Sequence, residues 1–149
     1  MTMLPIHIQR LRPGAQLPSY STAQAAGADL HACIDAPMVI DAGETVLVPT
    51  GFAMALPESY AGLIYARSGL ATKRGLAPAN KVGVIDPDYR GEVMVSLHNH
   101  SQAPQTIVPG ERIAQLIITP YLTGVFTEVD ALDDTERGSG GFGSTGQVS

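Results

Sequence analysis

Short apolar stretches recur along most of this chain at intervals of about eight to twelve residues, and turns containing glycine or proline separate them. This spacing is typical of β-sandwiches and β-barrels. The sequence holds 11 prolines, 16 glycines and no tryptophan, which favours short strands over long helices. We therefore predict an all-β, jelly-roll-like barrel or sandwich. Expected strands are residues 4–12, 38–40, 44–48, 51–56, 60–66, 93–97, 111–118 and 121–129, with a further strand opening at Asp29.

The segment 80–97 is the most distinctive part of the chain. Two apolar runs, 82–85 and 93–97, flank a polar turn that begins with Asp86 and Pro87. Proline fixes its own φ and disfavours the helical region for the residue before it, so we expect a hairpin with a tight tip. Carboxylates in such turns commonly bond only to nearby backbone N–H groups. An aspartate at the end of an apolar strand can also orient a water molecule, and the segment alone leaves both interpretations open.

Residues 66–75 predict one short helix, which ends at Gly75. Ser68 has the residue type of an N-cap, a role that is most often structural. The free N–H groups of a helix start, next to Arg67, also suit a phosphate group.

Five segments together resemble the motifs of the deoxyuridine triphosphate nucleotidohydrolases (dUTPases), and they occur in that family's order. They are residues 25–32, 67–71, 83–92, 110–117 and 138–146. The departures are Ala66, Lys81 and Pro87, and none of them removes a catalytic group. A single such motif is weak, whereas five in order over most of the chain are specific.

The resemblance implies hydrolysis of dUTP to dUMP and pyrophosphate by attack of water on the α-phosphorus. This reaction limits uracil incorporation into DNA and supplies dUMP for thymidylate synthesis. The resemblance makes Asp86 the catalytic residue that orients and deprotonates the water. It places Tyr89 against the deoxyribose. The uracil edge is then read by Asn80 and by the backbone of Gly83, Val84 and Ile85.

The resemblance also implies residues that bind the phosphates. The α- and β-phosphates fall to Arg67, Ser68, Gly69 and Gln115. The γ-phosphate is enclosed by a tail containing Arg137, Gly143, Ser144 and Thr145, with Phe142 stacked on uracil. Mg²⁺ is the implied cofactor, held mainly by the substrate phosphates. Asp29 supports the site through arginine contacts and through metal-bound water.

The chain changes character at residue 130, where an acidic, glycine-rich segment begins. By composition this is an ordinary disordered terminus. The resemblance instead implies a β-barrel core, residues 1–129, and a flexible arm, residues 130–149, that closes over the nucleotide. In this family the subunits form homotrimers whose three sites lie between chains. Fully extended, the arm spans ~60 Å at ~3.3 Å per residue, enough to reach a neighbouring subunit.

Charge and cysteine content exclude several classes of function. The net charge is −5 and no basic cluster occurs, which argues against a nucleic-acid partner. Cys33 is the single cysteine, so neither an intrachain disulfide nor a zinc–thiolate site is expected. His98 and His100 lack a third ligand and are expected to face solvent. No signal peptide or long apolar run occurs, so we expect a cytoplasmic protein without a membrane partner. Charged residues make up only 15%, which suggests that partner subunits cover apolar surface.

Two other functions compete with the hydrolase. The first is dCTP deaminase, which resembles this fold but has a glutamate base where Ser96 stands here. The second is a non-enzymatic trimeric binding protein. Tyr89 favours the hydrolase over the deaminase, and Asp86, Arg67 and the arm favour an enzyme over a scaffold.

Overall fold

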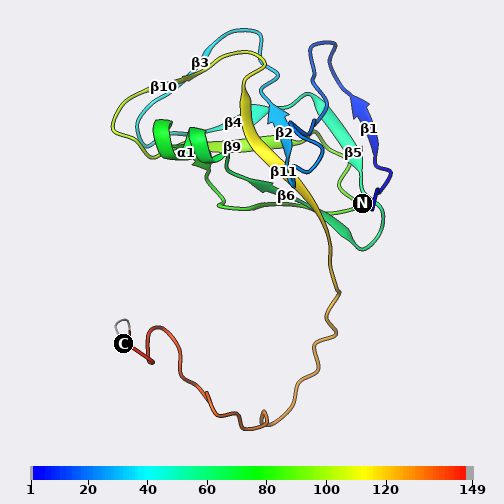
Figure 1. Cartoon of the computed structure of the whole chain (residues 1–149), viewed down its shortest axis with the longest axis vertical. Coiled ribbons are helices and arrows are strands. Elements are labelled where there is room, and N and C mark those ends of the chain that lie inside the picture. Colours follow the sequence, from blue (N-terminus) through cyan, green and yellow to red (C-terminus); the bar gives the residue numbers. More distant parts are fainter. Residues whose placement is uncertain (1, 147–149) are drawn as a thin grey trace.

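The computed structural model, which describes residues 2–146, is an all-β, jelly-roll-like sandwich with one short helix (Figure 1). Its two larger sheets are antiparallel. The first has the order β2 (Ala28–His31), β11 (Arg112–Pro120), β6 (Tyr60–Tyr65) and β8 (Gly83–Ile85). The second has the order β4 (Thr45–Pro49), β9 (Met94–Asn99) and β7 (Leu76–Pro78). Two ribbons complete the fold: β1 (His7–Arg10) with β5 (Phe52–Ala55), and β3 (Met38–Ile40) with β10 (Gln105–Ile107).

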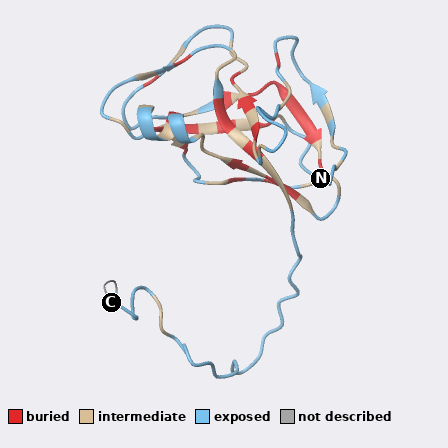
Figure 2. Cartoon of the chain, viewed as in Figure 1, coloured by how far each residue is buried: buried red, intermediate tan, exposed pale blue. Residues whose placement is uncertain are grey.

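The core lies between the sheets, which share one cluster of buried apolar side chains. The alternation predicted for the strand after the polar turn is confirmed. Val93, Val95 and Leu97 are at most 2% exposed, while Met94 and Ser96 between them are half-buried. Burial therefore follows the strands, as the red segments of Figure 2 show. The predicted inward packing of Ile6 and Ile8 before and within β1 is also confirmed.

The predicted helix is confirmed as α1 (Ser68–Arg74). Its N-cap is Arg67 rather than Ser68, and no side chain of the described residues 2–146 caps that end. Gly75 ends the helix at φ 69°, in the left-handed region where glycine is the least strained residue. Arg74 in the last turn pairs with Glu111, just before β11, and donates to the carbonyl of Thr106 in β10, which ties the helix to both strands.

The predicted hairpin is wrong in its pairing. Its two strands exist, but β8 pairs with β6 and β9 pairs with β4 and β7, so they belong to different sheets. A hairpin loop is usually two to five residues long, and the connection 86–93 is longer than that. The segment therefore crosses from one sheet to the other, and the pocket described below lies at this crossing.

The predicted strand 121–129 is also wrong for this chain. This segment leaves β11, and most of its side chains are exposed, including Leu122 at 98% and Phe126 at 98% (Figures 1 and 2). A strand forms only where another strand accepts its hydrogen bonds, and residues 2–146 provide none beside this segment. Conversely, β7 and β10 were not predicted: each is three residues long and, unlike β3 and β8, each contains a proline or two polar residues instead of an apolar run.

Candidate active site

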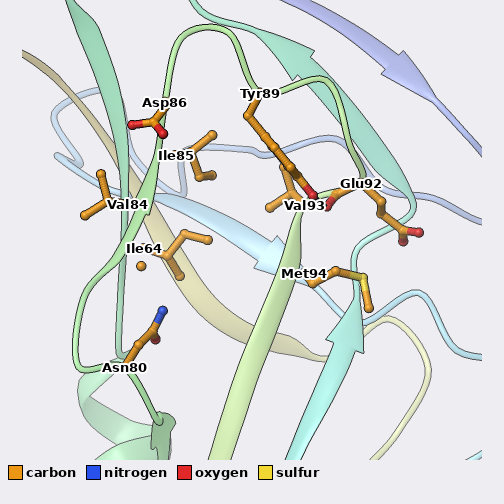
Figure 3. A pocket seen from close by; sticks show the side chains of 10 residues that line it. Ile64, Asn80, Val84, Ile85, Asp86, Tyr89, Glu92, Val93 and Met94 are labelled. Carbon is orange, nitrogen blue, oxygen red and sulfur yellow. Dashed lines mark hydrogen bonds between the residues drawn. The ribbon is translucent and has the colours of Figure 1, made fainter.

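A pocket of about 220 Å³ lies where the chain crosses between the two sheets (Figure 3). It contains Asp86 and five of the residues predicted to contact base or sugar. Its lining consists of Ile64, Asn80, Gly83, Val84, Ile85, Asp86, Tyr89, Glu92, Val93 and Met94.

One wall of this pocket is the edge strand β8. Its pairing with β6 runs from Ile64↔Gly83 to Gly62↔Ile85, and no strand within residues 2–146 pairs with its other side. An edge strand presents free backbone N–H and C=O groups, which can pair with a ligand as they would with another strand. Val84 is 64% exposed whereas Ile85 is buried, so the strand anchors itself on one face only. The pocket therefore offers backbone hydrogen bonds of fixed spacing.

Asp86 follows β8 directly and is exposed. Its backbone carbonyl closes the turn by accepting a hydrogen bond from the N–H of Tyr89, at 3.2 Å. Within residues 2–146 no hydrogen bond or ion pair occupies its carboxylate. The turn thus holds itself together without that carboxylate, which remains available to a water molecule.

Tyr89 is held in a defined orientation on the opposite side of the pocket from Asp86 (Figure 3). Its hydroxyl donates to the carbonyl of Glu92 at 2.9 Å. Its ring lies against Gly91, where an added methyl group would come within 2.6 Å of the ring carbon Cζ. The ring is 45% exposed, so one part of it is fixed and the rest faces solvent. This arrangement suits a rigid apolar surface for a ligand.

A second group of predicted residues lies on β2, β11 and the start of α1. The Asp29 carboxylate forms ion pairs with Arg67 Nε at 3.2 Å and with Arg112 Nη1 at 3.4 Å. The Asp29 side chain is only 13% exposed. Gln115 Nε2 donates to the carbonyl of Ala66 at 2.8 Å, so the predicted buried amide has a partner. Asp29 and Gln115 therefore fix the position of the segment that carries Arg67.

Arg112 and His31 belong to this second group and were not among the predicted site residues. The register places them opposite each other, Arg112 on β11 and His31 on β2. Both residues lie within motif segments, 25–32 and 110–117, and this position was the sequence signal that could have identified them as site residues. His31 Nδ1 is a buried side-chain atom that has no hydrogen-bond partner among the described residues, 2–146. Burial lowers the pKa of His31 below 6.5; the Asp29 carboxylate opposes this effect, and the guanidinium groups of Arg112 and Arg67 add to it.

The predicted arm residues are not brought to either group. The segment 137–146, drawn in orange and red, lies away from the sandwich (Figure 1). Phe142 is fully exposed at φ 52°, and short turns such as Ser144 N–H to Gly141 C=O, at 3.0 Å, bend the segment locally. Residues 147–149 of the predicted arm lie outside the described residues.

Within residues 2–146 no three or more His, Cys, Asp or Glu side chains gather as they would around a metal ion. In the same residues, no helix has the length and apolarity that crossing a membrane requires.

A family model described as dUTPase matches residues 14–146, which include both groups of site residues and most of the arm. This chain belongs to the dUTPase family. A dUTPase hydrolyses dUTP to dUMP and pyrophosphate, so the chain is a nucleotide hydrolase. Family membership decides against the deaminase and the non-enzymatic binding protein.

Similar proteins agree over the full length. A deoxyuridine 5'-triphosphate nucleotidohydrolase of Paraburkholderia phymatum is 49% identical over 97% of this chain and 98% of that relative. A dUTPase of Staphylococcus bacteriophage 80alpha, solved with dUpNHpp, has a TM-score of 0.88 and 26% identity over 97% of this chain and 99% of that one. The dUTPase from phage phi11 of S. aureus, whose structure concerns a structural Mg(II) ion, shares the fold. Its TM-score is 0.79 at 22% identity, over 88% of this chain and 100% of that one.

Proposed function

We propose that Asp86 orients and deprotonates the water that attacks the α-phosphorus of dUTP. The observation that carries this proposal is the Asp86 carboxylate, which no side chain or backbone group of residues 2–146 occupies and which lines the same pocket as the fixed ring of Tyr89. A positioned base accelerates such a step about 10²–10⁴-fold. Binding of dUpNHpp by the similar phage dUTPase supports a deoxyuridine nucleotide as the ligand.

In this proposal the pocket selects both base and sugar. The free edge of β8, at Gly83, Val84 and Ile85, pairs with the uracil edge, and Asn80 at the far end of the pocket completes the contact (Figure 3). Tyr89 packs on the deoxyribose and leaves no room for a 2′-hydroxyl. A hydrogen-bonding site rejects ligands that leave its groups unpaired, which disfavours cytosine.

The phosphates in turn bind at the second group of residues. Arg67 supplies the charge and is oriented by Asp29, while Ser68 and Gly69 are exposed at the start of α1. Gln115 completes this surface. A guanidinium held by a buried carboxylate loses little further freedom when it binds a phosphate, which favours electrostatic stabilisation of the transition state.

One chain does not bring the two groups onto the same phosphate. Asp86 follows the Gly62↔Ile85 pair and so lies level with position 61 of β6, whereas Arg67 lies just beyond the other end of that strand. Six positions, from 61 to 67, span roughly 20 Å at ~3.3 Å per residue. We therefore propose a homotrimer in which Asp86 of one subunit faces Arg67 of another.

The segment that follows β11, residues 121–132, supports the same assembly. Residues 121–132 expose apolar side chains, among them Leu122, Phe126 and Leu132. A large exposed apolar surface usually marks an interface. We propose that residues 1–129 form the core and that the arm, 130–149, closes over the site of another subunit. Arg137, Gly143, Ser144 and Thr145 then contact the γ-phosphate and Phe142 stacks on uracil.

Magnesium is proposed as the cofactor. The donor set around Asp29 fits an ion that keeps its waters, because this carboxylate already pairs with two arginines and can reach a metal only through water. Mg²⁺ is then held mainly by the substrate phosphates, whose charge it neutralises. We also propose a cytoplasmic location, where the reaction limits uracil incorporation into DNA and supplies dUMP for thymidylate synthesis.

Asp86→Asn tests the catalytic assignment. The substitution removes the base and keeps the shape of the turn, so we expect dUTP turnover to fall at least ~100-fold while binding of dUpNHpp is retained. Pyrophosphate release and calorimetric titration measure the two quantities. The exposed Asp88, in the same turn, provides the matched control as Asp88→Asn. Full turnover by Asp86→Asn would remove this residue from the proposed role.

A further inference from the structure

An ion pair lies behind the wall of the nucleotide pocket and connects it to the N-terminal ribbon. Arg12, two residues beyond β1, pairs through Nη2 with Oε2 of Glu92. Glu92 also lines the pocket, at the foot of the Tyr89 ring (Figure 3). The side chains are 44% and 22% exposed, so the pair is partly shielded from water.

Glu92 is fixed by a second contact, at a backbone position that requires glycine. Its carboxylate accepts a hydrogen bond from the N–H of Gly51 at 2.9 Å. Gly51 has φ 80°, and an added methyl group would lie 2.7 Å from Cβ of Ala15 and 2.8 Å from Sγ of Cys33. The left-handed conformation and the absence of a side chain both suit glycine, and they let the Gly51 N–H reach Glu92.

The residue after Glu92 is held by the same segment. The carbonyl of Val93 accepts from the N–H of Thr50 at 3.2 Å and from its Oγ1 at 2.6 Å. The N–H of Val93 donates to the carbonyl of Phe52 at 2.9 Å. Residues 50–52 thus hydrogen-bond to residues 92 and 93 through both backbone and side-chain groups.

The backbone at residues 92–93, which these hydrogen bonds fix, also orients Tyr89. The Tyr89 hydroxyl donates to the carbonyl of Glu92 at 2.9 Å, and the ring lies against Gly91. Movement of the backbone at residues 91–92 would therefore move the ring. The free edge of β8 lies outside these contacts. Asp86 is joined to Tyr89 only through its backbone, whose carbonyl accepts from the Tyr89 N–H at 3.2 Å, and its carboxylate takes no part.

We infer that Arg12 and Glu92 are positioning residues that set the selection of deoxyribose over ribose by holding Tyr89 against the sugar. This inference rests on the proposed contact between Tyr89 and the sugar. Neither side chain is assigned a contact with the reacting atoms. Loss of the ion pair loosens the wall on the sugar side, so that a 2′-hydroxyl is accommodated, while the water-activating carboxylate keeps its place.

The test is the selectivity ratio, kcat/KM for dUTP divided by kcat/KM for UTP, of the full-length enzyme with Mg²⁺. We expect Arg12→Gln and Glu92→Ala each to lower this ratio about tenfold, mainly through a lower KM for UTP. Arg12→Lys, which keeps the charge, should retain most of the ratio. Because the two residues act through one contact, the double variant should lose no more than the larger single loss.

Arg10→Gln is the matched control. Arg10 is exposed on β1, two residues before Arg12, and forms no ion pair with residues 2–146. Its substitution removes the same charge as Arg12→Gln. Its ratio should equal that of the parent. The thermal unfolding midpoint is measured for every variant, and activity is assayed well below that temperature. Lost selectivity is thereby separated from lost folding.

Tyr89→Ala separates this inference from the assignment on which it rests. If Tyr89→Ala loses selectivity while Arg12→Gln and Glu92→Ala keep the parent ratio, the positioning role is wrong and the sugar contact stands. If Tyr89→Ala itself keeps the ratio, the sugar contact is wrong and the positioning role falls with it. Additive losses in the double variant would also overturn the shared contact.

Discussion

At the scale of the residue, Lys81 has an unusual backbone conformation for its type. It has φ 66°, in the left-handed region, at the bend that precedes β8. A side chain in that region costs about 1–2 kcal/mol because Cβ crowds the carbonyl oxygen. Lys81 was also the one departure from the family pattern that borders the predicted uracil contact. The physical effect visible in the structure is backbone strain beside the pocket.

Replacing Lys81 by glycine should therefore stabilise the protein. We expect Lys81→Gly to gain about 0.5–1 kcal/mol, since relief of strain exceeds the added entropy of the unfolded chain. Urea denaturation measures the difference. Lys73→Gly, inside α1, is the opposite control and should lose about 1 kcal/mol. Equal losses in the two variants would show that φ at Lys81 carries no strain.

His31 makes stability depend on pH. Its pKa is lowered on folding, chiefly by burial, so the unfolded chain binds more protons once the pH falls below 6.5. The stability contributed by neutral His31 is present above pH 6.5 and is lost as the pH falls through the lower pKa of the folded state. His31→Gln should flatten this decline in denaturation midpoints between about pH 5 and pH 7.5. His100→Gln, at an exposed position, should leave the decline unchanged; equal slopes in both variants would contradict the assignment.

At the scale of the element, the buried polar side chain of Asn99 ends β9 and connects three segments. Its Nδ2 donates to the carbonyls of Ile40 and Ala103, both at 2.9 Å, and its Oδ1 accepts from the N–H and the hydroxyl of Ser101. The residue is fully buried. The strand β9 is thereby tied to β3 and to the turn that follows it.

Asn99→Ala should cost about 3 kcal/mol, because it leaves several buried carbonyl and N–H groups without partners at about 1–3 kcal/mol each. The midpoint of chemical unfolding reports the loss. His98→Ala, one residue earlier, removes a single exposed contact with Thr45 and should cost less than about 1 kcal/mol. A loss for Asn99→Ala as small as for His98→Ala would mean that water replaces its bonds.

The elements also show the limit of sequence reasoning. Alternation around Val95 predicted β9 and its buried face, because the side-chain period of a strand is local. Pairing is not local: the turn at Asp86 looked like a hairpin, yet it connects two sheets. Asn99 was overlooked for a similar reason, since its burial depends on segments far away in the sequence.

In the whole molecule, the segment after β11, from residue 121 to residue 146, is separate from the sandwich. It follows β11 with its apolar side chains exposed, and the two halves of the proposed site lie at opposite ends of β6. Each chain thus exposes what another chain can bury, as expected for an assembly with shared sites.

Deletion of residues 137–149 should leave the oligomer intact and reduce dUTP turnover at least ~100-fold, since closure over the phosphates positions them and excludes water. Light scattering after gel filtration gives the oligomeric state and pyrophosphate release gives the rate. Retention of normal turnover by the shortened chain would remove the arm from the site. Phe142→Ala in the full-length protein serves as the milder counterpart.

Periodicity and turn chemistry are local, so the sequence alone predicted the all-β class, the helix that ends at Gly75 and the buried face of β9. The reaction was predicted from the resemblance of five ordered motifs to a known family. Three kinds of contact became visible only in the folded chain: the pairing of the strands, which leaves β8 with a free edge, the ion pair of Asp29 with Arg67, and that of Arg12 with Glu92. These contacts join positions far apart in the chain. Their geometry follows from how the sheets pack, which no local pattern encodes.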